Sequence, residues 1–129
     1  MTLVDTSVWI EVFRRTRPLD LESLVPFDDI VTCLPVVQEV LQGFGDESAY
    51  RIAREAMLSL PIVESPLSTE VFLEAAGLYR TARRLGYTVR SSIDCIIGAC
   101  ALRHDLEVLH RDRDFTSLAR VSPLRQRQA

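Results

Sequence analysis

Hydrophobic positions along the chain form short blocks whose spacing alternates between that of buried strands and that of amphipathic helices. A continuous apolar run of about four residues is typical of a buried strand, whereas apolar residues three or four apart form one face of a helix. Four strands are predicted on this basis, over residues 2–5, 30–33, 61–63 and 107–109. The first of them ends in an aspartate, Asp5.

Helical spacing occurs between these strands and after the last one. Helices are predicted directly after residue 5, from Pro35 to the glycines at 43 and 45, over about 48–60, from 68 or 69 to Gly86, from 91 or 92 to about 104, and over 115–118. In the fourth of them, an apolar stripe is expected from Phe72, Ala75, Ala76, Tyr79 and Ala82. The tail from residue 125 to 129 is expected to be mobile.

Alternating strands and helices predict an α/β fold with three layers, α/β/α, around a short and mostly parallel sheet. The 129 residues are enough for one globular domain and too few for two, so a single domain over 1–129 is expected. No apolar run approaches the length of a membrane span, and the N-terminus lacks the pattern of a signal peptide. We therefore expect a soluble cytoplasmic protein with no membrane partner.

The composition excludes several classes of function. All fifteen basic residues are Arg, and the chain has no Lys, which argues against P-loop phosphate binding and Schiff-base catalysis. The three cysteines, Cys33, Cys95 and Cys100, lie in apolar segments and are expected to be reduced core residues.

The net charge of −3 is unevenly distributed along the chain. Residues 1–64 carry five Arg against eleven acidic residues, and residues 65–129 carry ten Arg against seven. Neutralising four acidic residues with a metal would make the total slightly positive. The composition therefore permits a polyanionic substrate.

Four acidic residues fall where a parallel sheet places its ligand site, beyond the carboxyl ends of the strands. Asp5 ends the first predicted strand, Asp112 follows the last one, Asp94 lies in the first turn of a helix and Glu39 lies on the helix after the second strand. Converging carboxylates repel one another unless a cation binds them, and Mg²⁺ or Mn²⁺ prefers such oxygen ligands. A metal of this kind can promote phosphodiester hydrolysis.

Each of these residues also has a purely structural interpretation. Asp5 can cap the first helix, and Asp94 fits a capping box three residues after Ser91. Glu39 alone is typical of a solvated helix residue, and Asp112 and Asp114 are typical of a turn. The spacing leaves these alternatives open.

Four segments, taken together, resemble the PIN-domain family, and within it the VapC toxins of bacterial toxin–antitoxin pairs. They are Leu-Val-Asp-Thr-Ser-Val-Trp-Ile (3–10), Pro-Val-Val-Gln-Glu-Val (35–40), Ser-Ile-Asp-Cys-Ile-Ile-Gly-Ala (92–99) and Leu-His-Arg-Asp-Arg-Asp-Phe (109–115). The segments occur in the family's order and span nearly the whole chain.

The resemblance implies a Mg²⁺- or Mn²⁺-dependent endoribonuclease toxin that acts on RNA and is held inactive by a VapB-type antitoxin. It assigns catalytic and metal-binding roles to Asp5, Glu39, Asp94 and Asp112, with Asp114 as a further candidate ligand and Ser7 orienting Asp5. Relatives suggest a homodimer, for which Trp9 and Phe13 are candidate contacts.

Candidate RNA-binding residues are the arginines at the end of the fourth predicted helix and beside the last strand, because guanidinium groups suit phosphate contacts. They are Arg80, Arg83, Arg84, Arg90, Arg111 and Arg113. His110 stands where many relatives carry Thr or Ser, and we assign it no catalytic role. The alternative functions are a non-catalytic RNA- or protein-binding module of the same fold and, ranked last, a phosphatase that forms an aspartyl-phosphate.

Overall fold

The computed structural model describes all residues, 1–129, and contains a five-stranded sheet with helices on both faces. All strand pairings are parallel, in the order β3-β2-β1-β4-β5. The strands are β1 (Thr2–Val4), β2 (Ile30–Cys33), β3 (Ile62–Val63), β4 (Glu107–His110) and β5 (Gln126–Gln128). The predicted α/β class and parallel sheet are confirmed.

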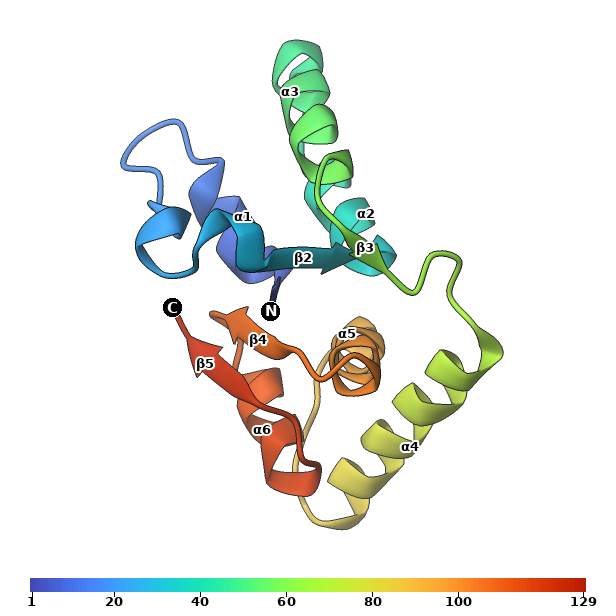
Figure 1. Ribbon diagram of the computed structural model, residues 1–129. Coiled ribbons are helices and arrows are strands. Elements are labelled where there is room, and N and C mark those ends of the chain that lie inside the picture. Colours follow the sequence, from blue (N-terminus) through green and yellow to red (C-terminus); the bar gives the residue numbers. More distant parts are fainter.

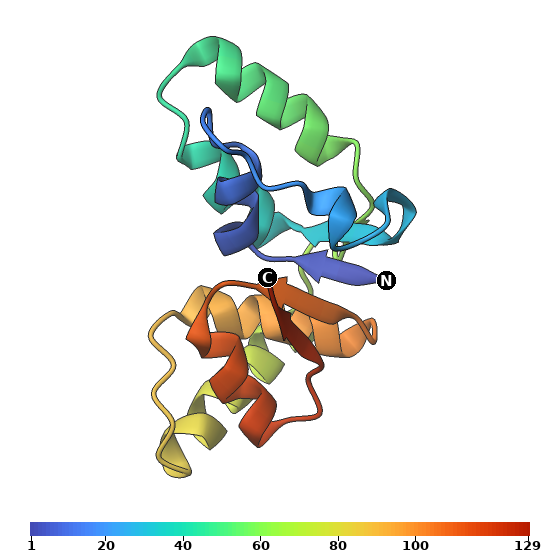
Figure 2. The same ribbon diagram turned by 90° about the vertical axis from the view of Figure 1, so that its left-hand side faces the viewer.

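The helices form two layers, with α1 to α3 on one face of the sheet and α4 to α6 on the other (Figures 1 and 2). Their bounds are α1 (Thr6–Val12), α2 (Leu34–Gln42), α3 (Glu47–Leu58), α4 (Thr69–Arg84), α5 (Ser92–Arg103) and α6 (Arg113–Val121). Two short 3-10 helices, Leu21–Ser23 and Phe27–Asp29, precede β2. None of the helices combines the length and apolar character needed to cross a bilayer.

The core is built on β1, β2 and β4, since both faces of the central strands are covered by helices. Leu3, Val4, Val108 and Leu109 are fully buried, and they belong to one cluster of 29 buried hydrophobic residues. The cysteines are free and buried, as the sequence predicts. Helix α5 contributes a continuous buried face that includes Ile97, whereas α4 is mostly exposed.

The prediction for the chain's end is wrong. Residues Gln126–Gln128 form β5, which pairs with β4, and the Ala129 backbone N–H donates to the His110 carbonyl at 2.8 Å. This strand carries no apolar side chain, as is common at a sheet edge, so hydrophobic periodicity does not detect it.

The apolar stripe predicted on α4 is also partly wrong. Ala75 and Ala82 are buried together with Val71, but Phe72 and Tyr79 are about 49% and 38% exposed. Ala76 is exposed as well, and Phe72 and Tyr79 border a pocket between α4 and α5 instead of being buried between them. On the opposite side of the sheet, Trp9 is buried, and its ring stacks on Phe13 with centroids 5.8 Å apart.

Candidate active site

The strand order reverses between β1 and β4, because β1 continues outward to β2 while β4 lies on its other side. Open parallel sheets bind ligands beyond the carboxyl ends of the strands at such a point. The two strand ends are tied together, since the Asp5 backbone N–H donates to the Leu109 carbonyl at 2.9 Å. Asp5 therefore lies beside the segment that leads to Asp112.

Asp5 caps α1 and also presents a free oxygen to the site. Its Oδ2 accepts hydrogen bonds from the backbone N–H of Ser7 at 3.0 Å and from the Ser7 hydroxyl at 2.6 Å. Its Oδ1 is buried without a partner. Burial raises the pKa of Asp5, although the bonds from Ser7 oppose that shift. The capping interpretation therefore accounts for one oxygen of Asp5 and not for the other.

Ser7 connects the two strand ends. Its hydroxyl donates to Asp5 and accepts a hydrogen bond from the backbone N–H of Arg111 at 2.9 Å. Because a hydroxyl oxygen has one proton and two lone pairs, both bonds form together and fix its rotamer. The orientation of the Asp5 carboxylate is thereby linked to the backbone just before Asp112.

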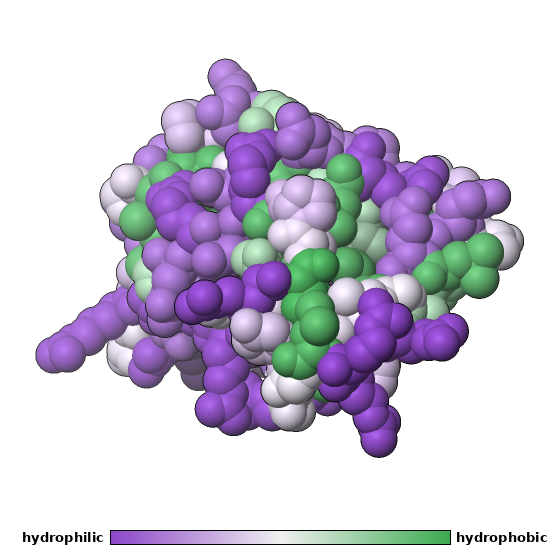
Figure 3. All heavy atoms as spheres, turned by 90° about the horizontal axis from the view of Figure 1, so that it is seen from below, coloured by the Kyte–Doolittle hydropathy of each residue, from purple (hydrophilic) through white to green (hydrophobic).

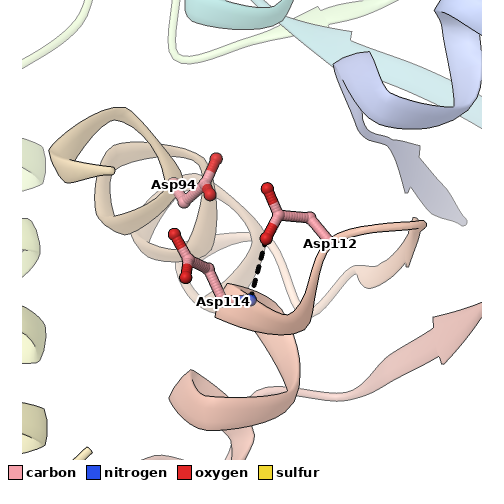
Figure 4. Close-up of side chains that lie close together, drawn as sticks. All are labelled: Asp94, Asp112 and Asp114. Atoms are coloured by element: carbon pink, nitrogen blue, oxygen red, sulfur yellow. Dashed lines mark hydrogen bonds between the residues drawn. The ribbon is translucent and has the colours of Figure 1, made fainter. Parts of the chain in front are cut away.

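Asp94, Asp112 and Asp114 converge beside Asp5, each from the start of a helix. Each offers a carboxylate oxygen, and these oxygens lie within 4.8 Å of one another. Figure 4 shows Asp94 on α5 pointing toward the two aspartates at the start of α6. Three carboxylates in so small a volume repel one another, so the arrangement favours either bound protons or a bound cation.

Asp94 has the most perturbed carboxyl group of the site. Burial raises its pKa to about 9, and the neighbouring carboxyl of Asp114 and the charges of Asp5 and Asp112 add to the shift. Its Oδ2 is buried without a hydrogen-bond partner. The capping box with Ser91 does not form, because the Ser91 side chain makes no capping bond. A structural role as a cap therefore does not explain Asp94.

Asp114 is 1% exposed, and both of its carboxylate oxygens accept hydrogen bonds from backbone N–H groups. The Arg90 N–H donates to both oxygens at 3.1 Å, and the Ser91 N–H donates to Oδ2 at 3.0 Å. Asp112 caps α6 by accepting a bond from the Asp114 N–H at 2.9 Å, as Figure 4 shows. Asp114 thus fastens the segment before α5 to the start of α6.

Glu39 lies at the margin of this cluster. Its Oε1 accepts a hydrogen bond from the Thr6 hydroxyl at 2.8 Å, and Thr6 directly follows Asp5. The group of oxygens that lie within 4.8 Å of one another does not include Glu39. The structure therefore brings Asp94, Asp112 and Asp114 into one group with Asp5 beside them, and connects Glu39 to it through Thr6.

His110, to which the sequence analysis assigned no catalytic role, supports the site from within the core. Its ring is 1% exposed and lies against Phe115, with centroids 5.3 Å apart. Nδ1 accepts a hydrogen bond from the Asp112 N–H at 3.1 Å, so the ring proton is on Nε2, which faces Gln126 Oε1 at 2.5 Å. The polar strand β5 thus supports the backbone that carries Asp112.

The six candidate arginines differ in their surroundings. The Arg90 guanidinium lies 3.8 Å from Asp112 and from Asp114, and that of Arg111 lies 3.8 Å from Glu11. The other four are exposed and form no ion pair: Arg80, Arg83, Arg84 and Arg113. These four remain available for an anionic ligand.

The cluster has the features of a site for a hard divalent cation. Asp5 Oδ1 and Asp94 Oδ2 are buried acceptors without a donor, which costs folding free energy unless a proton or a cation compensates. Arg90 is the only cationic side chain that pairs with the cluster. It is 56% exposed, and its guanidinium nitrogens lie 3.8 Å from the nearest oxygens of Asp112 and Asp114. Oxygen-only donors of this kind suit Mg²⁺ or Mn²⁺.

Comparisons with known proteins agree with this geometry. The family model described as PIN domain matches residues 2–121. The chain is 38% identical to Ribonuclease VapC11 of Mycobacterium tuberculosis and to a VapC ribonuclease of Mycobacterium bovis, over 96% of both chains in each case.

Solved structures show the same fold at lower identity. A member of the VapBC family of toxin-antitoxin systems from M. tuberculosis, VapBC-5, matches with a TM-score of 0.74 and 22% identity, over 99% of this chain and 98% of that one. VapBC2 from Rickettsia felis, bound to a DNA fragment from its promoter, matches with a TM-score of 0.76 and 15% identity over the same shares of the two chains.

Proposed function

The chain belongs to the PIN-domain family, and we propose that it is a toxin endoribonuclease that hydrolyses RNA with Mg²⁺ or Mn²⁺ held by its acidic cluster. Relatives that match it over 96% of its length at 38% identity are named ribonucleases. The observation that carries the metal requirement is the pair of buried, unpartnered oxygens on Asp5 and Asp94.

The metal would be held by Asp5, Asp94 and Asp112, directly or through water, with Glu39 reaching it from the margin through water. When bound, such a cation polarises the phosphodiester and lowers the pKa of an attacking water. Asp114 is a positioning residue in this proposal, because its oxygens accept the backbone N–H groups of Arg90 and Ser91 and so hold the segment before α5 against α6. Ser7 is a second positioning residue, since it fixes the rotamer of Asp5.

The site residues bind and orient the substrate as well as the cation. Burial and the neighbouring carboxylates raise the pKa of Asp94 to about 9, which favours its protonated form, and a bound cation would favour the carboxylate form that can act as a ligand. The Arg90 guanidinium lies 3.8 Å from Asp112 and from Asp114, and Arg111 and Arg113 flank Asp112 in the sequence, so these three arginines would contact the phosphates of the RNA.

The proposed partner is a VapB-type antitoxin that inhibits the ribonuclease. This part of the proposal is supported by the VapC relatives and by the likeness to VapBC complexes over nearly the whole chain. The homodimer expected from the family remains a prediction. Trp9 is buried and Phe13 packs on it, which leaves little of the indole ring for a contact between subunits.

RNA cleavage by the purified chain tests the proposed function. We expect the protein to cleave a labelled RNA with Mg²⁺ or Mn²⁺ and the Asp94→Asn variant to lose cleavage. The matched control, Asp28→Asn, should cleave like the parent, because Asp28 is exposed and lies on a 3-10 helix that contributes no residue to the cluster. Equal cleavage by both variants would overturn the assignment of the site. RNA binding without any cleavage would favour the non-catalytic module.

A further inference from the structure

A cavity of about 290 Å³ lies between the C-terminal end of α4 and the loop that leads to α5. It is lined by Tyr79 and Arg83 of the helix and by Gly86, Tyr87, Thr88 and Val89 of the loop. Its size is at the lower end of the range for small-ligand pockets. Two aromatic rings and a guanidinium therefore border a space that suits a planar ligand of modest size.

The aromatic and basic side chains around this cavity form no hydrogen bond or ion pair within the protein. Tyr79 and Tyr87 are each 38% exposed. Arg83 forms no ion pair, and neither do the neighbouring Arg80 and Arg84. These groups remain free to contact a ligand.

The surroundings of the cavity are strongly positive in a protein whose net charge is −3. Between Glu74 and Asp94 the chain has four arginines and no acidic residue. Figure 3 views the end of the molecule where α4 runs into the loop, and hydrophilic side chains surround a few apolar ones there. Three of these arginines, Arg80, Arg83 and Arg84, form no ion pair, and unpaired positive charge of this kind attracts a polyanion.

The loop also connects the cavity to the acidic cluster. Val89, which lines the cavity, is 6% exposed and anchors the loop in the core. The next two residues, Arg90 and Ser91, donate their backbone N–H groups to Asp114. Since three residues span at most about 11 Å, Tyr87 lies within reach of an RNA strand bound at the carboxylates.

We propose that Tyr79, Arg83 and Tyr87 form a subsite that holds one base and an adjoining phosphate of the RNA next to the scissile bond. Unpaired bases stack on aromatic side chains, and Arg pairs with phosphate oxygens. This inference rests on the proposed ribonuclease function. It adds residues that contact the substrate outside the carboxylate cluster.

The test measures the affinity of the full chain for a fluorescent single-stranded RNA by anisotropy, in an Asp94→Asn background that prevents cleavage. Stacking on an aromatic side chain contributes about 1–3 kcal/mol per base, which corresponds to an affinity loss of about 5- to 150-fold in Tyr87→Ala or Tyr79→Ala. Tyr87→Phe keeps the ring and is expected to bind normally. Tyr50→Ala, on α3, is the matched control.

Substrates that lack a single base identify the contact independently. One abasic position is expected to weaken binding to the parent and to make no further difference in Tyr87→Ala, because both changes remove the same stacking. The subsite would be overturned if Tyr87→Ala and Tyr79→Ala bound the RNA as tightly as Tyr50→Ala does. It would also be overturned if the abasic position still weakened RNA binding in Tyr87→Ala.

The two proposals can fail separately. Cleavage of RNA by the unaltered chain decides the ribonuclease function, whereas the difference between Tyr87→Ala and Tyr50→Ala decides the subsite. In the active protein, Tyr87→Ala is expected mainly to raise KM, since stacking stabilises bound substrate and transition state alike.

Discussion

Nδ1 of His110 accepts a hydrogen bond from the backbone N–H of Asp112 at 3.1 Å, and this bond fixes the turn that presents the Asp112 carboxylate. An acceptor that bonds the N–H two residues ahead is the arrangement that Asn, Asp, Ser and Thr side chains form in turns. The imidazole performs the same task here, and Gln126 faces its other nitrogen.

His110→Leu is therefore expected to weaken Mn²⁺ binding about 10- to 100-fold, the usual effect of losing a group that orients a metal ligand. His110→Asn restores an acceptor and is expected to recover most of the affinity. Calorimetric titration of the two variants provides the measurement. Equal losses in both would show that His110 acts only by filling space against Phe115.

The raised pKa of Asp94 predicts how stability depends on pH without metal. An acid whose folded pKa, about 9, exceeds its ordinary value of 3.8 keeps its proton in the folded state while the unfolded chain releases it. The free energy of unfolding therefore falls as pH rises through that window. Asp94→Asn is expected to flatten this slope and to stabilise the metal-free protein at pH 8 by about 1–3 kcal/mol.

Urea denaturation in EDTA between pH 5 and pH 9 measures this slope. Asp28→Asn is the control, because its carboxyl group is exposed. A parent protein whose stability stays constant or rises over the whole window would contradict the assignment of a buried proton to Asp94.

Ser7→Ala removes the hydroxyl that bonds both Asp5 and the Arg111 N–H. The Asp5 carboxylate would then be free to rotate, so we expect RNA cleavage to fall about 10- to 100-fold while the fold is retained. The initial rate at saturating Mn²⁺ is the measurement. The control is Ser48→Ala, at an exposed position on α3, which should cleave RNA at the parent's rate. If Ser7→Ala cleaved at the same rate as this control, Ser7 would not be a positioning residue.

Asp114→Asn tests whether this carboxylate is chiefly structural. An amide would turn an N–H toward the donors of Arg90 or Ser91, which costs about 1–3 kcal/mol of stability. The thermal unfolding midpoint should therefore drop in EDTA, where no metal contributes. A normal midpoint combined with a complete loss of Mn²⁺ binding would instead identify Asp114 as a ligand.

Much of the fold was predictable because the central strands are short and apolar. The runs at residues 2–5 and 30–33 lie in the sheet as expected, and Asp5 follows β1 at its edge. Strand β5 was not predictable, because its three residues are polar and its place depends on backbone pairing with β4. Periodicity reports burial, and this edge strand buries little.

The sequence predicted which acidic residues lie in the candidate site, but it did not predict the role of each one. The motifs pointed to Asp94 and Asp112, and the structure brings both together with Asp114. Spacing could not show that Asp114 accepts backbone hydrogen bonds from a segment 23 and 24 residues away in sequence. The role of His110 likewise depends on Gln126, which lies 16 residues further along the chain.

The central prediction for this protein is that occupancy of the acidic cluster by a divalent cation controls RNA cleavage. The direct measurement is a Mn²⁺ titration in which binding, by calorimetry, and the rate of RNA cleavage are followed on the same protein. We predict that both curves share one midpoint and that Asp5→Asn loses both signals. Full cleavage in EDTA, or cleavage that saturates without Mn²⁺ binding, would contradict the account.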